Sequence, residues 1–139
     1  MAQLTFVNPA GLHDPVPFGY SHTAAVPAGA ELVLVAGQYG SGPDGAVVPG
    51  GFEEQVRQAF RNLATALAAH GLGLGDVVRI RTYVVDHDFA RLGAVSGAVK
   101  EGWGDRPPVQ TLVGVAALAA PDVLFEVEAE AVRAPAGSR

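Results

Sequence analysis

The amino-acid sequence predicts an α+β two-layer sandwich, in which a mixed β-sheet carries two helices on one face. Two observations lead to this class. Along the chain, three short strand-like runs are followed by a helix, a strand, a second helix and two further strands. The length of 139 residues suits one domain with one core, which we expect to span residues 1–139 with a flexible tail at 134–139.

The first third of the chain contains three apolar runs separated by proline and glycine, which predict strands at 4–7, 20–26 and 31–38. The third run, ELVLVAGQ, is nearly all apolar, which is typical of a strand buried on both faces. A glycine-rich stretch follows at 40–51 without the G-K-[ST] of a phosphate loop, so we expect a surface loop there.

Two segments have the periodicity of helices. Residues 52–70 repeat apolar side chains at three- and four-residue intervals, with Gly71 placed to end the helix. Residues 86–88 supply capping side chains for a second helix at 89–102. The side chains expected on the buried side of the second helix are Phe89, Leu92, Val95 and Val99.

The strands predicted at 76–85 and 123–132 both alternate, and their polar positions have opposite charge. One face of the first strand carries Arg79 and Arg81, and one face of the second carries three glutamates at alternate positions from 126 to 130. If the two strands share a sheet, the arginines face the glutamates across it. The runs 109–118 and 123–132 are separated by Pro121 and Asp122, which predicts a hairpin-like pair.

With both helices on one face of the sheet, the opposite face carries arginine, tyrosine and glutamate with apolar residues between them. No predicted element is left to cover that face. We therefore expect several copies of the chain to pack these faces together.

Composition excludes several classes of function. The net charge is −5, and the single lysine and eight arginines are dispersed, which argues against a nucleic-acid partner. The absence of cysteine excludes disulfides, thiolate metal sites and cysteine nucleophiles, and it fits a cytoplasmic protein. No apolar run has the length of a membrane span, and the N-terminus lacks the features of a signal peptide.

The histidines and serines provide no further signature. His13, His22, His70 and His87 lack the spacing of metal ligands, so we expect structural or surface roles for them and no metal site. The serines lie outside the context of a nucleophile elbow.

Several motifs in order resemble one known family. These are Tyr20, the strand ending in Ala36-Gly37-Gln38, the helix GFEEQVRQAFRNL, the junction at 86–89, and the C-terminal TLVGVAAL and FEVEAEAV. Together they resemble the Rid family of reactive-intermediate deaminases, also called the YjgF/YER057c/UK114 family, over nearly the whole chain.

The resemblance implies a chorismate-mutase-like fold and a homotrimer, in which the three sheets form a central barrel and three clefts lie between subunits. It also implies a small-molecule ligand. The best-known members hydrolyse enamines and imines to 2-oxo acids and ammonia without a metal or cofactor.

Three residues match the family's functional positions. Tyr20 corresponds to the cleft tyrosine, and Glu126 to the glutamate that positions the attacking water. Gly37 corresponds to the glycine whose backbone amide contacts the ligand. The resemblance therefore implies catalytic roles for Glu126 and Tyr20 and a binding role for Gly37.

Four other binding positions differ from the family pattern. Gln110 replaces the arginine that binds the substrate carboxylate, and a neutral amide provides neither its charge nor its bidentate geometry. Ala36 stands in place of a serine, Gly93 in place of an asparagine, and Leu112 in place of a small or thiol side chain. The cations that we consider as substitutes for the missing arginine are Arg79, Arg81 and Arg106.

Two functions remain open from the sequence. The first is enamine or imine hydrolysis of a small metabolite that is not a standard 2-imino acid. The second is a non-catalytic trimeric protein that binds a small ligand or regulates through it. The ribonuclease label sometimes attached to the family is discounted, because the chain is acidic and has no basic patch with interleaved aromatic residues.

Overall fold

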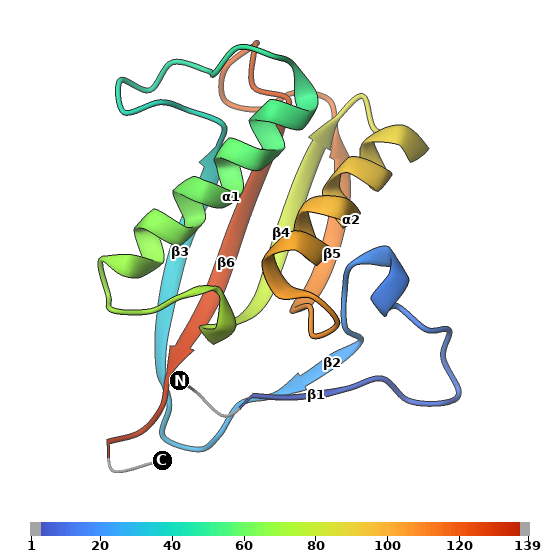
Figure 1. The fold of residues 1–139 in the computed structure, drawn as a ribbon, viewed down its shortest axis with the longest axis vertical. Coiled ribbons are helices and arrows are strands. Elements are labelled where there is room, and N and C mark those ends of the chain that lie inside the picture. The colour runs from blue at the N-terminus through green and yellow to red at the C-terminus, as the bar shows by residue number, and fades with distance from the viewer. Residues whose placement is uncertain (1–3, 137–139) are drawn as a thin grey trace.

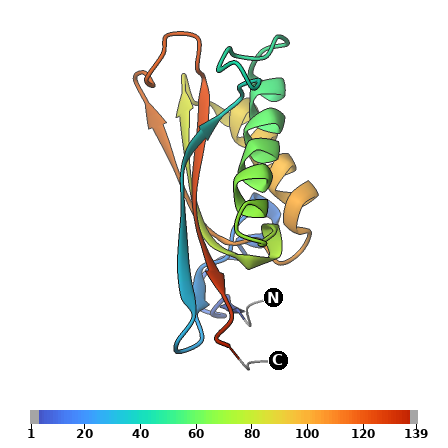
Figure 2. The ribbon, with the colours of Figure 1, turned by 90° about the vertical axis from the view of Figure 1, so that its left-hand side faces the viewer.

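The computed structural model describes residues 4–136 and has two layers, a four-stranded sheet and a pair of helices packed on one of its faces (Figures 1 and 2). The predicted α+β two-layer sandwich is therefore confirmed. The strands are β1 (Thr5–Val7), β2 (Thr23–Ala25), β3 (Glu31–Tyr39), β4 (Val77–Val85), β5 (Val109–Val115) and β6 (Phe125–Arg133). The helices are α1 (Phe52–Ala68) and α2 (Phe89–Trp103), with short 3-10 turns η1 (Val16–Phe18) and η2 (Leu74–Asp76).

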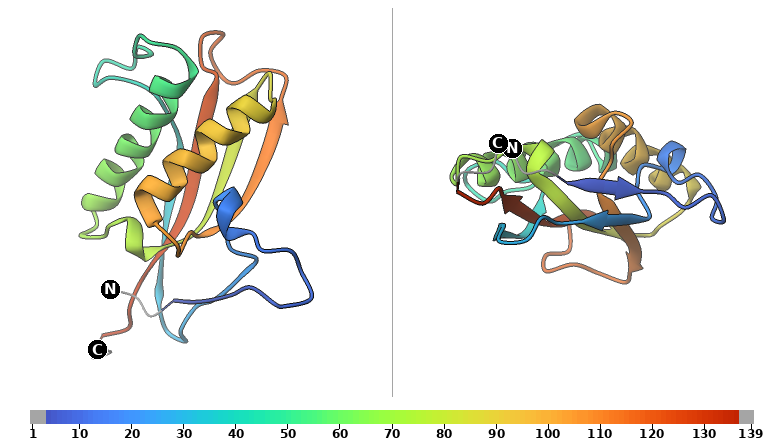
Figure 3. Two further views of the ribbon diagram at one scale, coloured as in Figure 1. Left: turned by 45° about the vertical axis from the view of Figure 1, so that its right-hand side comes forward. Right: turned by 90° about the horizontal axis from the view of Figure 1, so that it is seen from below.

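The main sheet has the strand order β3-β6-β4-β5. β6 pairs antiparallel with both β3 and β4, whereas β4 and β5 are parallel and are connected through α2. β1 and β2 pair with each other in a separate two-stranded ladder, which lies below the main sheet in Figure 3. The N-terminal strands therefore do not extend the main sheet.

The prediction that β5 and β6 form a hairpin-like pair is wrong. β4 lies between them, because α2 returns the chain parallel to β4 on its outer side and β6 then enters the space between β3 and β4. Pro121 and Asp122 lie in the long connection from β5 to β6, which passes over the end of β4. The local turn chemistry was present, but it joins strands that are not neighbours.

One buried side chain of α1 holds this connection in place. Gln55, which is 4% exposed, donates from Nε2 to the carbonyl oxygen of Asp122 at 3.0 Å. Its Oε1 accepts the backbone N–H of Leu124 at 2.9 Å. The amide therefore fixes the chain immediately before β6.

The core lies between the helices and the inner face of the sheet. It combines α1 side chains such as Leu63 and Leu67 with Val95 and Val99 of α2 and Phe125 and Val127 of β6. Each of these six side chains is at most 1% exposed. A bulge in β4 after Val77 turns Val77 into this core, while Val78 packs in a smaller cluster with Leu4 and Val132.

Within residues 4–136, no helix lies on the outer face of the main sheet, as Figure 2 shows. Leu32 and Leu34 of β3 lie on this face and are 56% and 69% exposed, whereas Val33 and Val35 are buried under α1. The prediction that this strand is buried on both faces is therefore wrong for a single copy of the chain. No element in the described part of the chain covers the second apolar face of β3.

The helix ends follow the sequence signals in part. Gly71, with φ of +70°, ends α1, and Leu72 donates its N–H back to Leu67 at 3.0 Å. Asp88 caps α2 by accepting the N–H of Arg91 at 2.8 Å. Phe89, predicted to be buried, is 90% exposed, because the first helical position turns away from the sheet.

At the C-terminus, packing continues beyond the expected start of the tail at 134. Ala134 packs against the cluster that contains Leu4 and Val132. The remainder of the expected tail, residues 137–139, lies outside the described residues.

Replacing Gln55 tests its role in holding the β5–β6 connection. We expect Gln55→Leu to lower the free energy of unfolding by about 1–3 kcal/mol, because two backbone groups lose their hydrogen-bond partner. Urea denaturation measures this difference. Gln58→Leu on the same helix is the control, since that amide bonds only to Asn62 and Arg61, and it should change stability by less than about 0.5 kcal/mol. Equal effects of the two variants would contradict the assignment.

Candidate functional site

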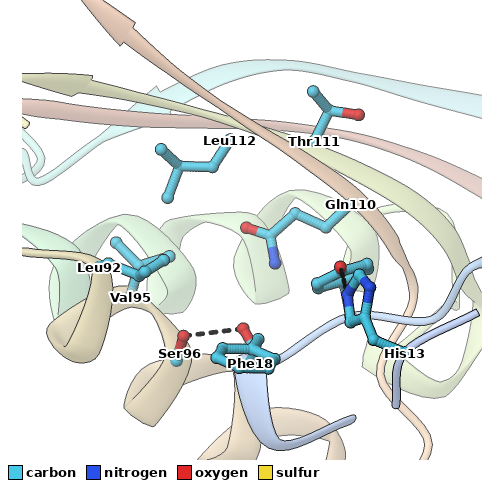
Figure 4. A pocket seen from close by; sticks show the side chains of 9 residues that line it. His13, Phe18, Leu92, Val95, Ser96, Gln110, Thr111 and Leu112 are labelled. Atoms are coloured by element: carbon cyan, nitrogen blue, oxygen red, sulfur yellow. Dashed lines mark hydrogen bonds between the residues drawn. The ribbon is translucent and has the colours of Figure 1, made fainter. Parts of the chain in front are cut away.

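A cavity of about 610 Å³ lies between α2, η1 and β5. Figure 4 shows Gln110 and Leu112 of β5 pointing toward α2, with Phe18 of η1 closing one side. The lining residues are His13, Phe18, Tyr20, Leu92, Val95, Ser96, Gln110, Thr111 and Leu112. Three of the residues singled out from the sequence, Tyr20, Gln110 and Leu112, therefore share one cavity.

The N-terminal segment that closes the cavity is attached to β5 and α2. Ser21 is 2% exposed, donates from Oγ to the carbonyl of Pro107 at 2.6 Å, and forms a parallel bridge to Val109. Ser96 of α2 donates from Oγ to the carbonyl of Phe18 at 2.8 Å (Figure 4). These contacts place Tyr20 along the free edge of β5.

Gln110 is held at both ends of its amide. The hydroxyl of Thr82, which is fully buried, donates to Oε1 of Gln110 at 2.9 Å. Nε2 of Gln110 donates to the carbonyl of Gly19 at 2.9 Å. One N–H and one acceptor position of the amide remain for a ligand. Gln110 is thus a tether between the sheet and the N-terminal segment as well as part of the cavity wall.

None of the nine lining residues carries a guanidinium, ammonium or carboxylate group. The three arginines considered as substitutes bind elsewhere. Arg79 and Arg81 pair with glutamates on the outer face of the sheet. Arg106 donates to the carbonyl of Leu4 at 3.0 Å and lies over the ring of Phe6. The cavity therefore presents mainly apolar side chains, and its polar rim holds no arginine, lysine, aspartate or glutamate.

Tyr20 has a histidine partner that sequence reasoning missed. Nε2 of His13 lies 2.5 Å from the hydroxyl oxygen of Tyr20, and both side chains line the cavity. We expected only a structural or surface role for His13. The sequence feature that could have indicated the contact between His13 and Tyr20 is the intervening segment DPVPFG. Its prolines and the turn η1 reverse the chain and bring residue 13 beside residue 20.

A second group of candidate residues lies on the outer face of the sheet. β3 has a bulge between Val35 and Gln38, so Ala36 and Gly37 have no register partner in β6. A Cβ added to Gly37 would lie 2.3 Å from Oε1 of Glu126. Only glycine lets the backbone of β3 approach the Glu126 carboxylate this closely.

The glutamates of β6 form a row on this face, and two of them are paired. Glu130 binds Arg79 through two oxygens at 3.0 Å and also contacts Arg81 at 3.1 Å. These bonds hold the pKa of the Glu130 carboxyl below its usual range. Glu128 accepts the hydroxyl of Tyr83 and lies 3.6 Å from Arg81. The cross-strand pairing of arginine and glutamate predicted from the sequence is confirmed.

Glu126 differs from its two neighbours, because within residues 4–136 it has neither an ion pair nor a hydrogen bond. Burial raises the pKa of the Glu126 carboxyl, and the negative charge of Glu128 raises it further. A carboxylate that is unpaired in the described chain and has a raised pKa is a better proton acceptor than an ordinary surface carboxylate.

The two groups of residues are separated by the sheet. Gln110 bonds to Thr82 on the inner face, whereas Glu126 is opposite Tyr83 on the outer face. A single copy therefore does not bring Tyr20 and Gln110 together with Gly37 and Glu126. Gly93 lies apart from both groups, in a groove between α1 and α2.

Over residues 4–136, no group of three or more histidine, aspartate or glutamate side chains is arranged to hold a metal ion. Neither α1 nor α2 has the length and hydropathy to cross a lipid bilayer.

The fold agrees with comparisons to known proteins. Residues 14–133 match the family model described as endoribonuclease L-PSP. The chain is 35% identical to the RutC family protein YjgH of Escherichia coli, covering 92% of this chain and 94% of that protein. It is 34% identical to the 2-iminobutanoate/2-iminopropanoate deaminase of Escherichia coli, over 73% and 80% of the two chains.

Among solved structures, the Rid family protein YyfB of Yersinia pestis superposes with a TM-score of 0.88 at 35% identity, covering 94% of this chain and 98% of that one. The chain therefore belongs to the endoribonuclease L-PSP family, which is the Rid or YjgF/YER057c/UK114 family. The resemblance identified from the sequence is confirmed, and with it the chorismate-mutase-like fold.

Variants of Glu126 and Glu130 test the pKa shifts assigned to the row of glutamates on β6. The pKa of Glu126 is raised, so its ionised form destabilises the fold, and this effect appears as pH rises through its folded-state pKa. Glu126→Gln should match the wild-type Tm at about pH 4 and exceed it at about pH 7. Differential scanning calorimetry across this range gives both values.

Glu130→Gln should behave in the opposite way. The pKa of Glu130 is lowered, so its ionised form stabilises the fold above the unfolded-state pKa, and this stabilisation is lost as pH falls through the folded-state pKa. The variant should have a lower Tm than wild type at neutral pH, and the difference should shrink on acidification. If the Tm differences between each variant and wild type changed with pH in the same direction, the opposite pKa shifts assigned to Glu126 and Glu130 would be refuted.

Proposed function

We propose that this protein hydrolyses the enamine or imine of a small, uncharged metabolite in a cleft formed by two copies of the chain. The observation that carries the proposal is Glu126, an unpaired carboxylate with a raised pKa beside the exposed backbone of Gly37. The deaminase named among the relatives supports the reaction class.

Two copies are needed because the sheet separates the candidate groups. One copy would contribute Tyr20 and Gln110 from its cavity, and the neighbouring copy would contribute Gly37 and Glu126 from its outer face. The exposed Leu32 and Leu34 on that face are suited to burial against another copy. We propose the trimer that the family resemblance implies.

The reaction requires a base and then an acid at one position. Glu126 takes a proton from water as the water oxygen bonds to the imine carbon, and the C=N electrons move to nitrogen. Glu126 then returns the proton to nitrogen, which gives a carbinolamine. Glu126 next takes the hydroxyl proton of the carbinolamine and delivers it to nitrogen as the C–N bond breaks, so that the C=O bond forms and ammonia leaves. A carboxyl with a raised pKa is suited to accept and release a proton in turn.

The cavity favours an uncharged substrate. Leu92, Val95 and Leu112 surround a space that no arginine or lysine lines, and the amide of Gln110 is largely used within the chain. A substrate carboxylate would lose its hydration here without gaining a charged partner. An apolar imine with one hydrogen-bonding end fits this lining.

A second candidate function is non-catalytic binding of a small ligand, and the observation that favours it is the tethering of Gln110. Because Thr82 and Gly19 occupy its amide, a residue at the family's substrate-binding position has a structural role here. Cleavage of RNA is not supported, since the chain has a net charge of −5 and no arginine or lysine lines the cavity.

Imine hydrolysis tests the proposal directly. Amino-acid oxidases and amine oxidases generate imines from charged and uncharged precursors, and semicarbazide traps the imine that remains. We expect wild type to act on imines from uncharged amines, Glu126→Gln to lose at least about 10²-fold in rate, and Gln110→Arg to gain activity on 2-imino acids.

A glycine pair provides the control for this assay. Gly37→Ala should lose activity because its methyl group displaces the Glu126 carboxylate, whereas Gly11→Ala has open space around it and should behave as wild type. If wild type and Gln110→Arg are both inert although a ligand binds, the non-catalytic function is the correct one.

Light scattering at micromolar concentration tests the assembly. Wild type should have the mass of a trimer. Leu34→Glu places a charge on the exposed apolar face of β3 and should shift the distribution of molecular masses toward smaller species. Ala68→Glu, on the exposed side of α1, should leave the mass unchanged. A monomeric wild type would refute the two-copy cleft.

A further inference from the structure

We propose that His13 is the proton-transfer partner of Tyr20 and carries protons between bulk water and the cavity. The inference deepens the proposed enamine or imine hydrolysis and rests on it. It assigns a role to a residue outside the family motifs that identified the site.

The geometry of the pair supports direct proton transfer. Nε2 of His13 is 2.5 Å from the hydroxyl oxygen of Tyr20, which is at the short end of the range for a hydrogen bond. His13 is exposed to solvent, whereas Tyr20 is half-buried. Both side chains line the cavity. The pair therefore connects the solvent to the interior of the cavity.

Neighbouring groups hold His13 in this position. Nε2 of His22 lies 2.8 Å from the backbone carbonyl of His13, and because a carbonyl only accepts, that nitrogen of His22 carries the hydrogen. The rings of His13 and His22 pack edge to face with centroids 4.9 Å apart, and the ring of Phe18 lies 6.1 Å from that of His13. The imidazole is therefore pre-positioned before a ligand enters.

Few other titratable groups act on this pair. The cavity residues from α2 are leucine, valine and serine, and those from β5 are glutamine, threonine and leucine. On its own segment, His13 is followed by Asp14, whose carboxylate accepts the N–H of Val16, and faces Tyr20 and His22. Among the described residues, the titratable groups that face or adjoin His13 are therefore Tyr20, His22 and Asp14.

The chemical task of the pair is protonation of an enamine at carbon. The hydroxyl O–H bond of Tyr20 breaks as a C–H bond forms at the enamine carbon, and the nitrogen lone pair forms the C=N bond of an iminium. His13 transfers its Nε2 proton to the tyrosine oxygen and is reprotonated by water. Glu126 of the neighbouring copy then directs water to the iminium carbon. Proton delivery and water activation are thus assigned to opposite walls of the cleft.

The pH dependence of the rate is the readout that a structural histidine would not change. Enamine turnover should fall as pH rises, because the imidazole of His13 must hold the proton that it passes to Tyr20. His13→Gln should lower kcat by about 10²-fold, change KM by no more than a few fold, and remove this dependence. His70→Gln, an exposed histidine whose side chain lies outside the cavity, is the matched control and should follow wild type.

A double substitution tests whether the two residues act together. If His13 works through Tyr20, then His13→Gln combined with Tyr20→Phe should be no slower than Tyr20→Phe alone, within about twofold. Losses that multiply in the double variant, or a His13→Gln enzyme that keeps the wild-type pH profile, would overturn the proposal.

Nuclear magnetic resonance separates this inference from the proposed function. If wild type is inert on every imine and enamine, hydrolysis is refuted, and the ring signals of His13 are followed against pH in wild type and Tyr20→Phe. If the titration midpoint of His13 differs by about 0.5 pH unit or more between wild type and Tyr20→Phe, the protonation of the two residues is coupled, which supports the pair for a different proton-transfer reaction. An unchanged midpoint refutes the pair itself.

Discussion

The alternation of β6 at the centre of the sheet is the constraint on which the rest of the structure depends. Its inner positions, Phe125 and Val127, are fully buried under the helices. The same two-residue period fixes Glu126 and its two following glutamates on the opposite face. The arginines of β4 form ion pairs with Glu128 and Glu130, the hydroxyl of Tyr83 donates to Glu128, and the bulge of β3 approaches Glu126. A shift of one residue would abolish the core and the carboxylate row together.

In the proposed cleft, the main sheet separates the two groups of site residues, so activity would depend on the association of two copies of the chain. The cavity on the helix side supplies shape and apolar contact, while the outer face supplies the carboxylate. In the proposed cleft, neither half is complete in an isolated copy. The stability of the assembly and the concentration of the protein then enter the apparent activity, as for any site formed at an interface.

The layer architecture, the two helices and the arginine–glutamate pairing could be predicted from the sequence because each depends on local periodicity or on alternation. The placement of β6 could not, because the order of strands depends on the crossover through α2, and the turn chemistry at Pro121 carries no information about which strands pair. His13 was missed for a similar reason. Its contact with Tyr20 depends on the path of a proline-containing segment, and neither residue type is unusual there. Phe89 shows that periodicity is least reliable at the first position of a helix.

The tether at Gln110 has an evolutionary consequence. An arginine at this position could still donate to the Gly19 carbonyl, but it offers no acceptor to the buried hydroxyl of Thr82. An arginine introduced at position 110 would therefore leave that hydroxyl unpaired, at a cost of about 1–3 kcal/mol, unless residue 82 changed first. The packing around Gln110 thus opposes a guanidinium at this position, and the order of the two substitutions would matter.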